Sequence, residues 1–252
     1  MATIQSGTGR IELFEDFLGA EWIVAETAAS GDLGPFRVIG DGGEQSDSGI
    51  IVDEALVPLS GVGIYTTSGD DNHAIGLSTS LCFEIGKMGT LVAECRVQFA
   101  DVLTKGFAFG LTNENADTVS IEDDIISIST NTFTISADDF VGFYFDAEAT
   151  SYATSWHGVY KGGTRTAPTL GVSVDFPNNL IVNGEWQILR FEIDTNGTAR
   201  WYIDGTLLQT ITGAASTTED LAVVALLGDH AGGAEVCYVD YLHVSANRDW
   251  TV

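Results

Sequence analysis

The most regular alternation of apolar and polar residues lies between positions 186 and 211. Two runs there carry an apolar residue at every second position, which predicts two half-buried β-strands. Gly197 lies in the short connection between them, and Asp204-Gly205 is a typical hairpin turn before a third strand. The segment therefore predicts an antiparallel meander, in which Glu192 lies opposite Arg200 as a favourable cross-strand pair.

Short runs of the same kind recur along the chain, and no long stretch has the period of an amphipathic helix. The remaining predicted strands cover 11–18, 36–39, 50–52, 63–67, 74–77, 81–85, 91–99, 107–112, 125–129, 133–135, 141–145, 156–160, 170–176, 221–227 and 236–244. We expect one all-β domain at residues 11–252, an antiparallel jelly-roll sandwich of two sheets, preceded by a polar N-terminal arm at residues 1–10.

Two turn signals give more local expectations. Gly86-Lys87-Met88-Gly89 predicts a hairpin that joins the strand at 81–85 to the strand at 91–99. Pro177-Asn178-Asn179 predicts a turn before the meander.

Three segments resemble a known fold family. They are the meander, the opening segment 14–17 with Trp22, and the closing segment 239–244, and together they resemble the concanavalin A-like, laminin G-like β-sandwiches. The resemblance implies that the closing strand pairs beside the first. Segments 107–112 and 141–146 resemble members of this fold found among the virion proteins of tailed phages. A fold does not by itself define a function.

The chain is strongly acidic, with 36 Asp and Glu against 10 Lys and Arg and a formal net charge of −26. Such a charge repels phosphate backbones and anionic lipids, so the sequence predicts neither a nucleic-acid nor a membrane partner. An acidic, solvated surface is the simplest interpretation. The alternatives are repulsion from packaged DNA and complementarity to a basic surface on a partner.

The cysteines and the N-terminus indicate where the chain folds. Three cysteines cannot all pair internally, and Cys95 and Cys237 lie in apolar strands, which predicts buried free thiols. The first residues lack the basic and apolar regions of a secretion signal. The sequence therefore predicts folding in a reducing cytosol.

No catalytic motif is recognisable. Glucanases of the resembled fold carry Glu, Asp and Glu at alternating positions of one strand. Glu192-Ile193-Asp194 supplies two of these acids, but the turn residues Asn196 and Gly197 follow where the third would stand. The four histidines are far apart in sequence and form no recognisable ligand cluster. We therefore expect a protein that is not an enzyme.

Acidic turns and aromatic residues are the remaining candidates for ligand binding. Asp70-Asp71-Asn72, Glu122-Asp123-Asp124 and Asp138-Asp139 offer oxygen ligands suited to calcium, although solvated acidic turns are the favoured interpretation and no cofactor is predicted. The aromatic candidates for stacking on sugar rings are Tyr152, Trp156 and Tyr160, and packing in the core or between subunits is the alternative.

These observations favour a non-enzymatic virion structural protein, a capsid decoration, cement or minor capsid protein. It would assemble in the host cytoplasm and lie on the outside of a tailed phage, with the major capsid protein and further copies of itself as partners. Ile4, Arg10, Pro35 and Phe36, in the arm and in the long loop at 28–48, are the predicted capsid contacts. The alternative is a carbohydrate-binding module or adhesin, and a glycoside hydrolase or lyase ranks third.

Overall fold

The computed structural model describes residues 3–5, 9–18, 22–23, 32–33, 35–41, 49–52, 61–171, 174–230 and 233–248. One helical turn, α1 (Ile85–Met88), and one π-helical turn, η2 (Ile121–Ile125), interrupt the strands. The strands are β1 (Thr3–Gln5), β2 (Arg10–Glu15), β3 (Trp22–Ile23), β4 (Asp32–Leu33), β5 (Phe36–Ile39), β6 (Gly49–Val52), β7 (Gly63–Thr66), β8 (Ala74–Ser78), β9 (Phe83–Glu84), β10 (Leu91–Phe99), β11 (Lys105–Thr112), β12 (Ile126–Ser129), β13 (Thr132–Ile135), β14 (Phe140–Asp146), β15 (Ser155–Lys161), β16 (Asp175–Leu180), β17 (Trp186–Ile193), β18 (Ala199–Ile203), β19 (Thr206–Ile211), β20 (Asp220–Asp229) and β21 (Val236–Asn247).

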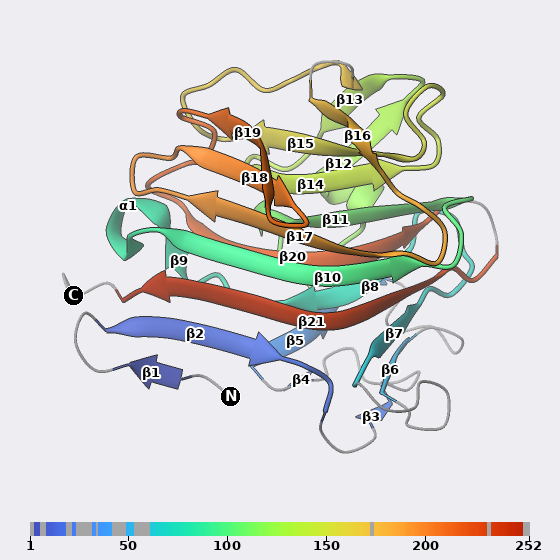
Figure 1. The fold of residues 1–252 in the computed structure, drawn as a ribbon, viewed down its shortest axis with the longest axis horizontal. Helices are drawn as coiled ribbons and strands as arrows, with labels where there is room; N and C mark the ends of the chain where they lie inside the picture. Colours follow the sequence, from blue (N-terminus) through green and yellow to red (C-terminus); the bar gives the residue numbers. More distant parts are fainter. Residues whose placement is uncertain are drawn as a thin grey trace.

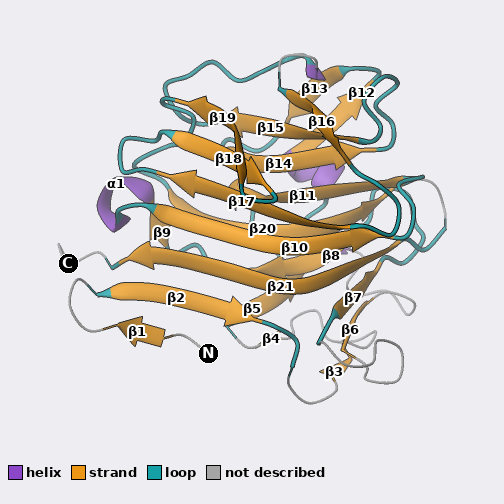
Figure 2. Cartoon of the chain, in the orientation of Figure 1, coloured by secondary structure: helices purple, strands orange, loops and turns teal. Residues whose placement is uncertain are grey.

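Two large antiparallel sheets lie face to face (Figures 1 and 2). The ten-stranded sheet has the order β19-β18-β17-β10-β21-β7-β6-β3, with β2 beside β21 and β1 beside β2. The nine-stranded sheet has the order β16-β15-β14-β11-β20-β8-β5-β4, with β9 beside β20, and β12 and β13 form a separate ribbon. The predicted all-β sandwich is confirmed, and so is the pairing of the closing strand β21 with the first long strand β2.

The meander has the predicted register, with Glu192 opposite Arg200. Gly197 adopts a positive φ of 75°, and Asp204 and Gly205 adopt positive φ values of 49° and 76° in the second turn. These left-handed conformations give a hairpin the twist of its flanking strands. Local sequence therefore determines this part of the sheet.

Aromatic side chains fill the space between the sheets. Phe145 lies 4.9 Å from Phe99 and 5.2 Å from Trp156, measured between ring centroids, and both contacts are edge-to-face. The indole nitrogen of Trp201 in one sheet donates to the carbonyl of Gly142 in the other at 2.8 Å. The core is thus tied together by polar as well as apolar contacts.

Two local predictions are wrong. Residues 85–88 form α1 instead of a hairpin loop, and β9 pairs with β20, not with β10. The N–H of Gly86 donates to the carbonyl of Thr217 at 3.0 Å, which holds this segment against the end of β20. Pro177 lies within β16, not in a turn. Proline is tolerated there because β16 is an edge strand, which does not need every N–H for pairing.

The N-terminal arm contributes β1, which pairs with β2 at the edge of the ten-stranded sheet. The predicted loop at 28–48 contains β4 and β5 and the described residues 35–41, and the rest of it lies outside the described residues. Within the described ranges, no helix is long and apolar enough to cross a bilayer.

Candidate functional site

The outer face of the ten-stranded sheet carries a row of side chains that runs across six strands. Residues directly opposite each other in antiparallel strands point to the same face, so the register defines the row. From β2 to β19 it consists of Phe14, His243, Glu94, Arg190, Tyr202 and Leu207. Five strand spacings of about 4.8 Å make it about 24 Å long. In Figure 1 no described element crosses in front of β2, β21 and β10.

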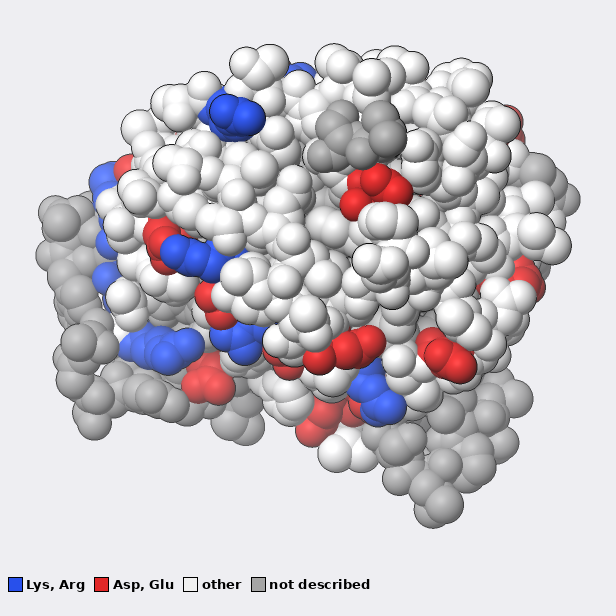
Figure 3. Space-filling view, turned by 45° about the horizontal axis from the view of Figure 1, so that its top comes forward, with Lys and Arg blue, Asp and Glu red and all other residues white. Residues whose placement is uncertain are grey.

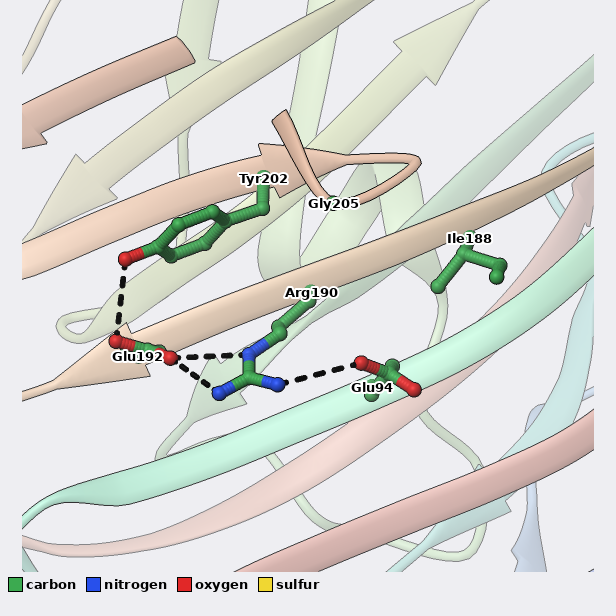
Figure 4. Close-up of a pocket in the computed structure, with 6 residues that line it drawn as sticks. All are labelled: Glu94, Ile188, Arg190, Glu192, Tyr202 and Gly205. Carbon is green, nitrogen blue, oxygen red and sulfur yellow. Dashed lines mark hydrogen bonds and ion pairs between the residues drawn. The ribbon is translucent and has the colours of Figure 1, made fainter. Parts of the chain in front are cut away.

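An open depression of about 200 Å³ lies in the middle of this row (Figure 4). Its walls come from β10, β17, β18 and the turn after β18. The lining residues are Glu94, Ile188, Arg190, Glu192, Tyr202 and Gly205. Gly205 has no side chain to obstruct the opening, and its turn makes one end of the depression.

Arg190 organises the polar groups of the depression. Its Nε donates to Oε1 of Glu192 at 3.0 Å, and its Nη1 lies 3.6 Å from Oε2 of Glu94. The guanidinium carbon lies 5.8 Å from the ring centroid of Tyr202, whose hydroxyl donates to Oε2 of Glu192 at 3.2 Å. The side chains are therefore held in place before any ligand arrives.

Two tyrosine hydroxyls border the carboxylates. The hydroxyl of Tyr241 donates to Oε1 of Glu94 at 2.7 Å. Burial raises the pKa of Tyr241, and its hydrogen bond to Glu94 raises it further. Burial and the neighbouring charge of Glu192 raise the pKa of Tyr202 as well. Both phenols therefore stay protonated as hydrogen-bond donors at neutral pH.

Further aromatic rings and ion pairs surround the depression. Arg96 lies 4.8 Å above the Trp186 ring and pairs with Asp240 at 2.7 Å. Phe14 and Tyr241 lie 6.1 Å apart, measured between ring centroids. Figure 3 shows basic and acidic side chains interleaved on this side of the molecule. Such a surface offers donors, acceptors and apolar rings together, which suits a ligand rich in hydroxyl groups.

The aromatic residues predicted to bind sugars do not belong to this surface. Trp156 is 0% exposed and Tyr160 is 7% exposed, so neither ring face is free to stack on a ligand. Tyr152 is partly buried, against His157. Sugar stacking is therefore contradicted for Trp156 and Tyr160, and core packing, the alternative interpretation, describes these two rings.

The four predicted capsid contacts do not share one environment in the structure. Phe36 is 1% exposed and packs in the core, so it is not available to a partner. Arg10 is exposed, and its guanidinium donates to the hydroxyl of Ser245 at 2.8 Å. Pro35 is partly buried, and Ile4 lies in β1, with a side chain outside the described residues.

In the part of the chain that the structure describes, one group of three side chains has the spacing of metal ligands. It consists of Glu122, Asp146 and His230. In the sequence His230 is an isolated histidine, and only the fold brings it beside Glu122 and Asp146. Glu122 belongs to an acidic turn considered for calcium, but no sequence spacing links it to Asp146 and His230, because the three residues lie on distant segments. The other acidic turns considered for calcium, at 70–72 and 138–139, are not part of it.

His157 gives the fold a pH dependence. Burial lowers its pKa to about 4, whereas histidine in an unfolded chain titrates near 6.5. The unfolded chain therefore binds more protons between these values, and stability falls as the pH falls from about 6.5 to 4. We expect this group to remove about 3 kcal/mol of unfolding free energy over that window, from 1.36 kcal/mol per pKa unit.

Urea denaturation at a series of pH values checks this expectation, with His157→Phe as the comparison. The variant keeps a ring between Phe133 and Tyr152 but cannot titrate. The stability difference between the two proteins should change by about 3 kcal/mol between pH 7 and pH 4. Parallel pH profiles would show that His157 does not contribute.

Solved structures of other proteins share this fold. No family model and no curated protein matches the sequence. A protein of unknown function from Shewanella oneidensis is 13% identical, with a TM-score of 0.63 over 99% of this chain and 92% of that one. Peanut lectin is 12% identical, with a TM-score of 0.57 over 94% and 97% of the two chains. A β-glucanase of Bacillus licheniformis is 13% identical, with a TM-score of 0.52 over 97% and 100%.

At these identities the similarity shows the fold alone. The chain is a concanavalin A-like β-sandwich, an architecture that lectins and β-glucanases share. The resemblance inferred from the sequence is confirmed at this level.

Proposed function

We propose that this chain is a non-catalytic carbohydrate-binding protein that holds a neutral oligosaccharide along the outer face of the ten-stranded sheet. The observation that carries the proposal is the cross-strand row centred on Glu94, Arg190 and Tyr202. Carboxylate oxygens accept hydrogen bonds from sugar hydroxyls, the guanidinium donates to them, and the tyrosine ring offers an apolar face. The length of the row favours several sugar units over one.

The charge of the site and of the whole chain supports a neutral ligand. Arg190 is already paired with two carboxylates, so the depression has no surplus positive charge for a sugar acid. The net charge of −26 also opposes the approach of an anionic polymer.

The contacts of the carboxylates support binding without hydrolysis. A glycosidase needs one carboxyl group that donates a proton and a second that acts as base or nucleophile. All four oxygens of Glu94 and Glu192 already face a donor, from Arg190, Tyr202 or Tyr241. Neither carboxyl group is free to deliver a proton to a leaving group.

A virion location, with the major capsid protein and further copies of this chain as partners, stays a prediction from the sequence. The comparisons with known structures do not bear on it.

A neutral-glycan array followed by calorimetry tests the proposal. We expect binding to a neutral oligosaccharide, and at least about tenfold weaker binding for Arg190→Met and for Tyr202→Ala, which corresponds to 1.4 kcal/mol. Arg165→Met is the matched control, because Arg165 is exposed on a loop outside the row and loses the same charge. Thermal melting confirms that each variant is folded.

Three results would overturn the proposal. Absence of binding to every neutral glycan removes the function. If Arg190→Met binds the glycan as tightly as the unmodified protein, the binding site lies elsewhere. Release of new reducing ends from a bound glycan makes the protein an enzyme.

A further inference from the structure

Three side chains from distant segments converge at one end of the nine-stranded sheet. Glu122 lies in η2, Asp146 is the last residue of β14, and His230 follows β20 directly. The pairing of Gly106 with both Asp146 and Gly228 brings these strand ends together. One ligand atom from each of the three side chains lies within 4.8 Å of the others.

His230 points into this cluster without a hydrogen bond. Its exposed fraction is 8%, and neither ring nitrogen has a hydrogen-bond partner among the described residues. Nδ1 faces a carboxylate oxygen of Glu122, and Nε2 lies 3.1 Å from Oδ1 of Asp146. A neutral imidazole carries one proton, so one of these nitrogens directs a lone pair at a carboxylate. The lone pair and the carboxylate oxygen repel each other. A cation bound by both would replace this repulsion with two coordination bonds.

The cluster has two acidic groups and no basic side chain to balance them. In the described part of the chain, no Lys or Arg forms an ion pair with Glu122 or Asp146. Asp146 is 1% exposed, and a buried carboxylate without a cation is costly.

Surrounding groups fix the orientation of the cluster. The Tyr144 hydroxyl donates to Oδ2 of Asp146, and the N–H of Glu148 donates to Oδ1 at 2.7 Å. Gly106 leaves room beside the imidazole, because a Cβ there would lie 2.9 Å from Nε2 of His230. Outer hydrogen bonds of this kind orient the ligands of protein metal sites.

We propose that Glu122, Asp146 and His230 bind a divalent transition-metal ion, with zinc preferred, and that the ion joins η2 to the ends of β14 and β20. Imidazole and carboxylate are both regular zinc ligands, and water completes the coordination. Manganese accepts the same ligands with lower affinity. Calcium requires six to eight oxygens, so a site with one nitrogen and two carboxylates does not favour it. The proposal is independent of carbohydrate binding.

The test uses the full chain without an affinity tag, stripped with a chelator and then titrated with one metal at a time in excess magnesium. Excess magnesium occupies weak sites on the acidic surface. We expect one equivalent of zinc to bind. Manganese should bind at the same site with lower affinity, and calcium should show no stoichiometric binding. Saturating zinc should raise Tm by roughly 5 °C or more.

His230→Gln and Glu122→Gln should each weaken zinc binding at least about tenfold and abolish the Tm rise. His243→Gln is the matched control, because His243 also faces a carboxylate, that of Glu12 at 3.5 Å, but lies on the sheet surface. The proposal is overturned if the parent binds no stoichiometric zinc, if His230→Gln binds it as tightly, or if His243→Gln loses it instead. Equal binding of calcium by the parent and by His230→Gln would also overturn it.

Discussion

Replacing Trp156 with alanine should lower the free energy of unfolding by about 3–5 kcal/mol. Trp156 is 0% exposed, and it packs against Phe99, Phe107 and Phe145 between the two sheets. Its Nε1 also donates to Oε1 of Gln187 at 2.9 Å, so the side chain ties β15 of one sheet to β17 of the other. The variant therefore loses a large buried ring and an inter-sheet hydrogen bond, and Tm should fall by roughly 10 °C.

Two further variants separate these contributions in urea denaturation. Trp156→Phe keeps most of the ring and loses the hydrogen bond, which costs about 1 kcal/mol beyond the lost volume. Trp186→Ala is the matched control, because Trp186 is partly exposed on the outer face beneath Arg96 and should cost about 1 kcal/mol. If Trp156→Ala is no more destabilising than Trp186→Ala, the indole does not hold the sheets together.

The burial of Trp156 contradicts the exposed aromatic surface predicted from the sequence, and the environment of its strand explains why. The strand Ser155–Lys161 is buried on both faces and contains His157 and Gly158 next to aromatic residues. Trp156 points toward the core, while His157 on the other face lies 5.2 Å from Phe133 of the small ribbon β12–β13. A ribbon that covers the outer face of one strand leaves no periodic signal in that strand. The polar residues near Trp156 in the sequence therefore predicted an exposed ring, although the ring is buried.

The site on the ten-stranded sheet was predictable only in its parts. Alternation places Glu94 on the polar face of β10 and Arg190 on the polar face of β17, and the structure confirms both. Their contact depends on the pairing of β10 with β17, across almost a hundred residues of sequence. Hairpin rules operate over a few residues and carry no information on such pairs. The local meander was therefore predictable, but the constellation that crosses into β10 was not.

The cluster around His230 was even less predictable from local sequence patterns. Glu122 reads as part of an acidic turn, Asp146 as the end of a strand, and His230 as an isolated histidine. Only the closure of the nine-stranded sheet brings β14 and β20 to the two sides of β11 and aligns their ends. Metal-ligand spacing in sequence exists where one segment supplies several ligands, and here each segment supplies one.

Replacing Lys105 with methionine should lower the free energy of unfolding by about 3–5 kcal/mol. The Lys105 side chain is 2% exposed, and its Nζ lies 2.6 Å from Oε2 of Glu235 and 3.1 Å from Oδ1 of Asp101. Glu235 is itself mostly buried, so the variant leaves a carboxylate out of water without its cation. The matched control is Lys87→Met, because Lys87 pairs with Glu84 at the surface and should cost less than about 1 kcal/mol.

A double-mutant cycle decides whether the loss comes from the stranded carboxylate or from lost packing. Methionine at position 105 retains most of the length of the lysine stem, so packing alone predicts a small loss. If the stranded charge is the cause, Lys105→Met combined with Glu235→Met should recover much of the stability that Lys105→Met loses alone. Asp101 is half exposed and stays solvated in the double variant. An additive loss in the double variant, or a single Lys105→Met no worse than Lys87→Met, would show that this buried pair does not stabilise the end of β11.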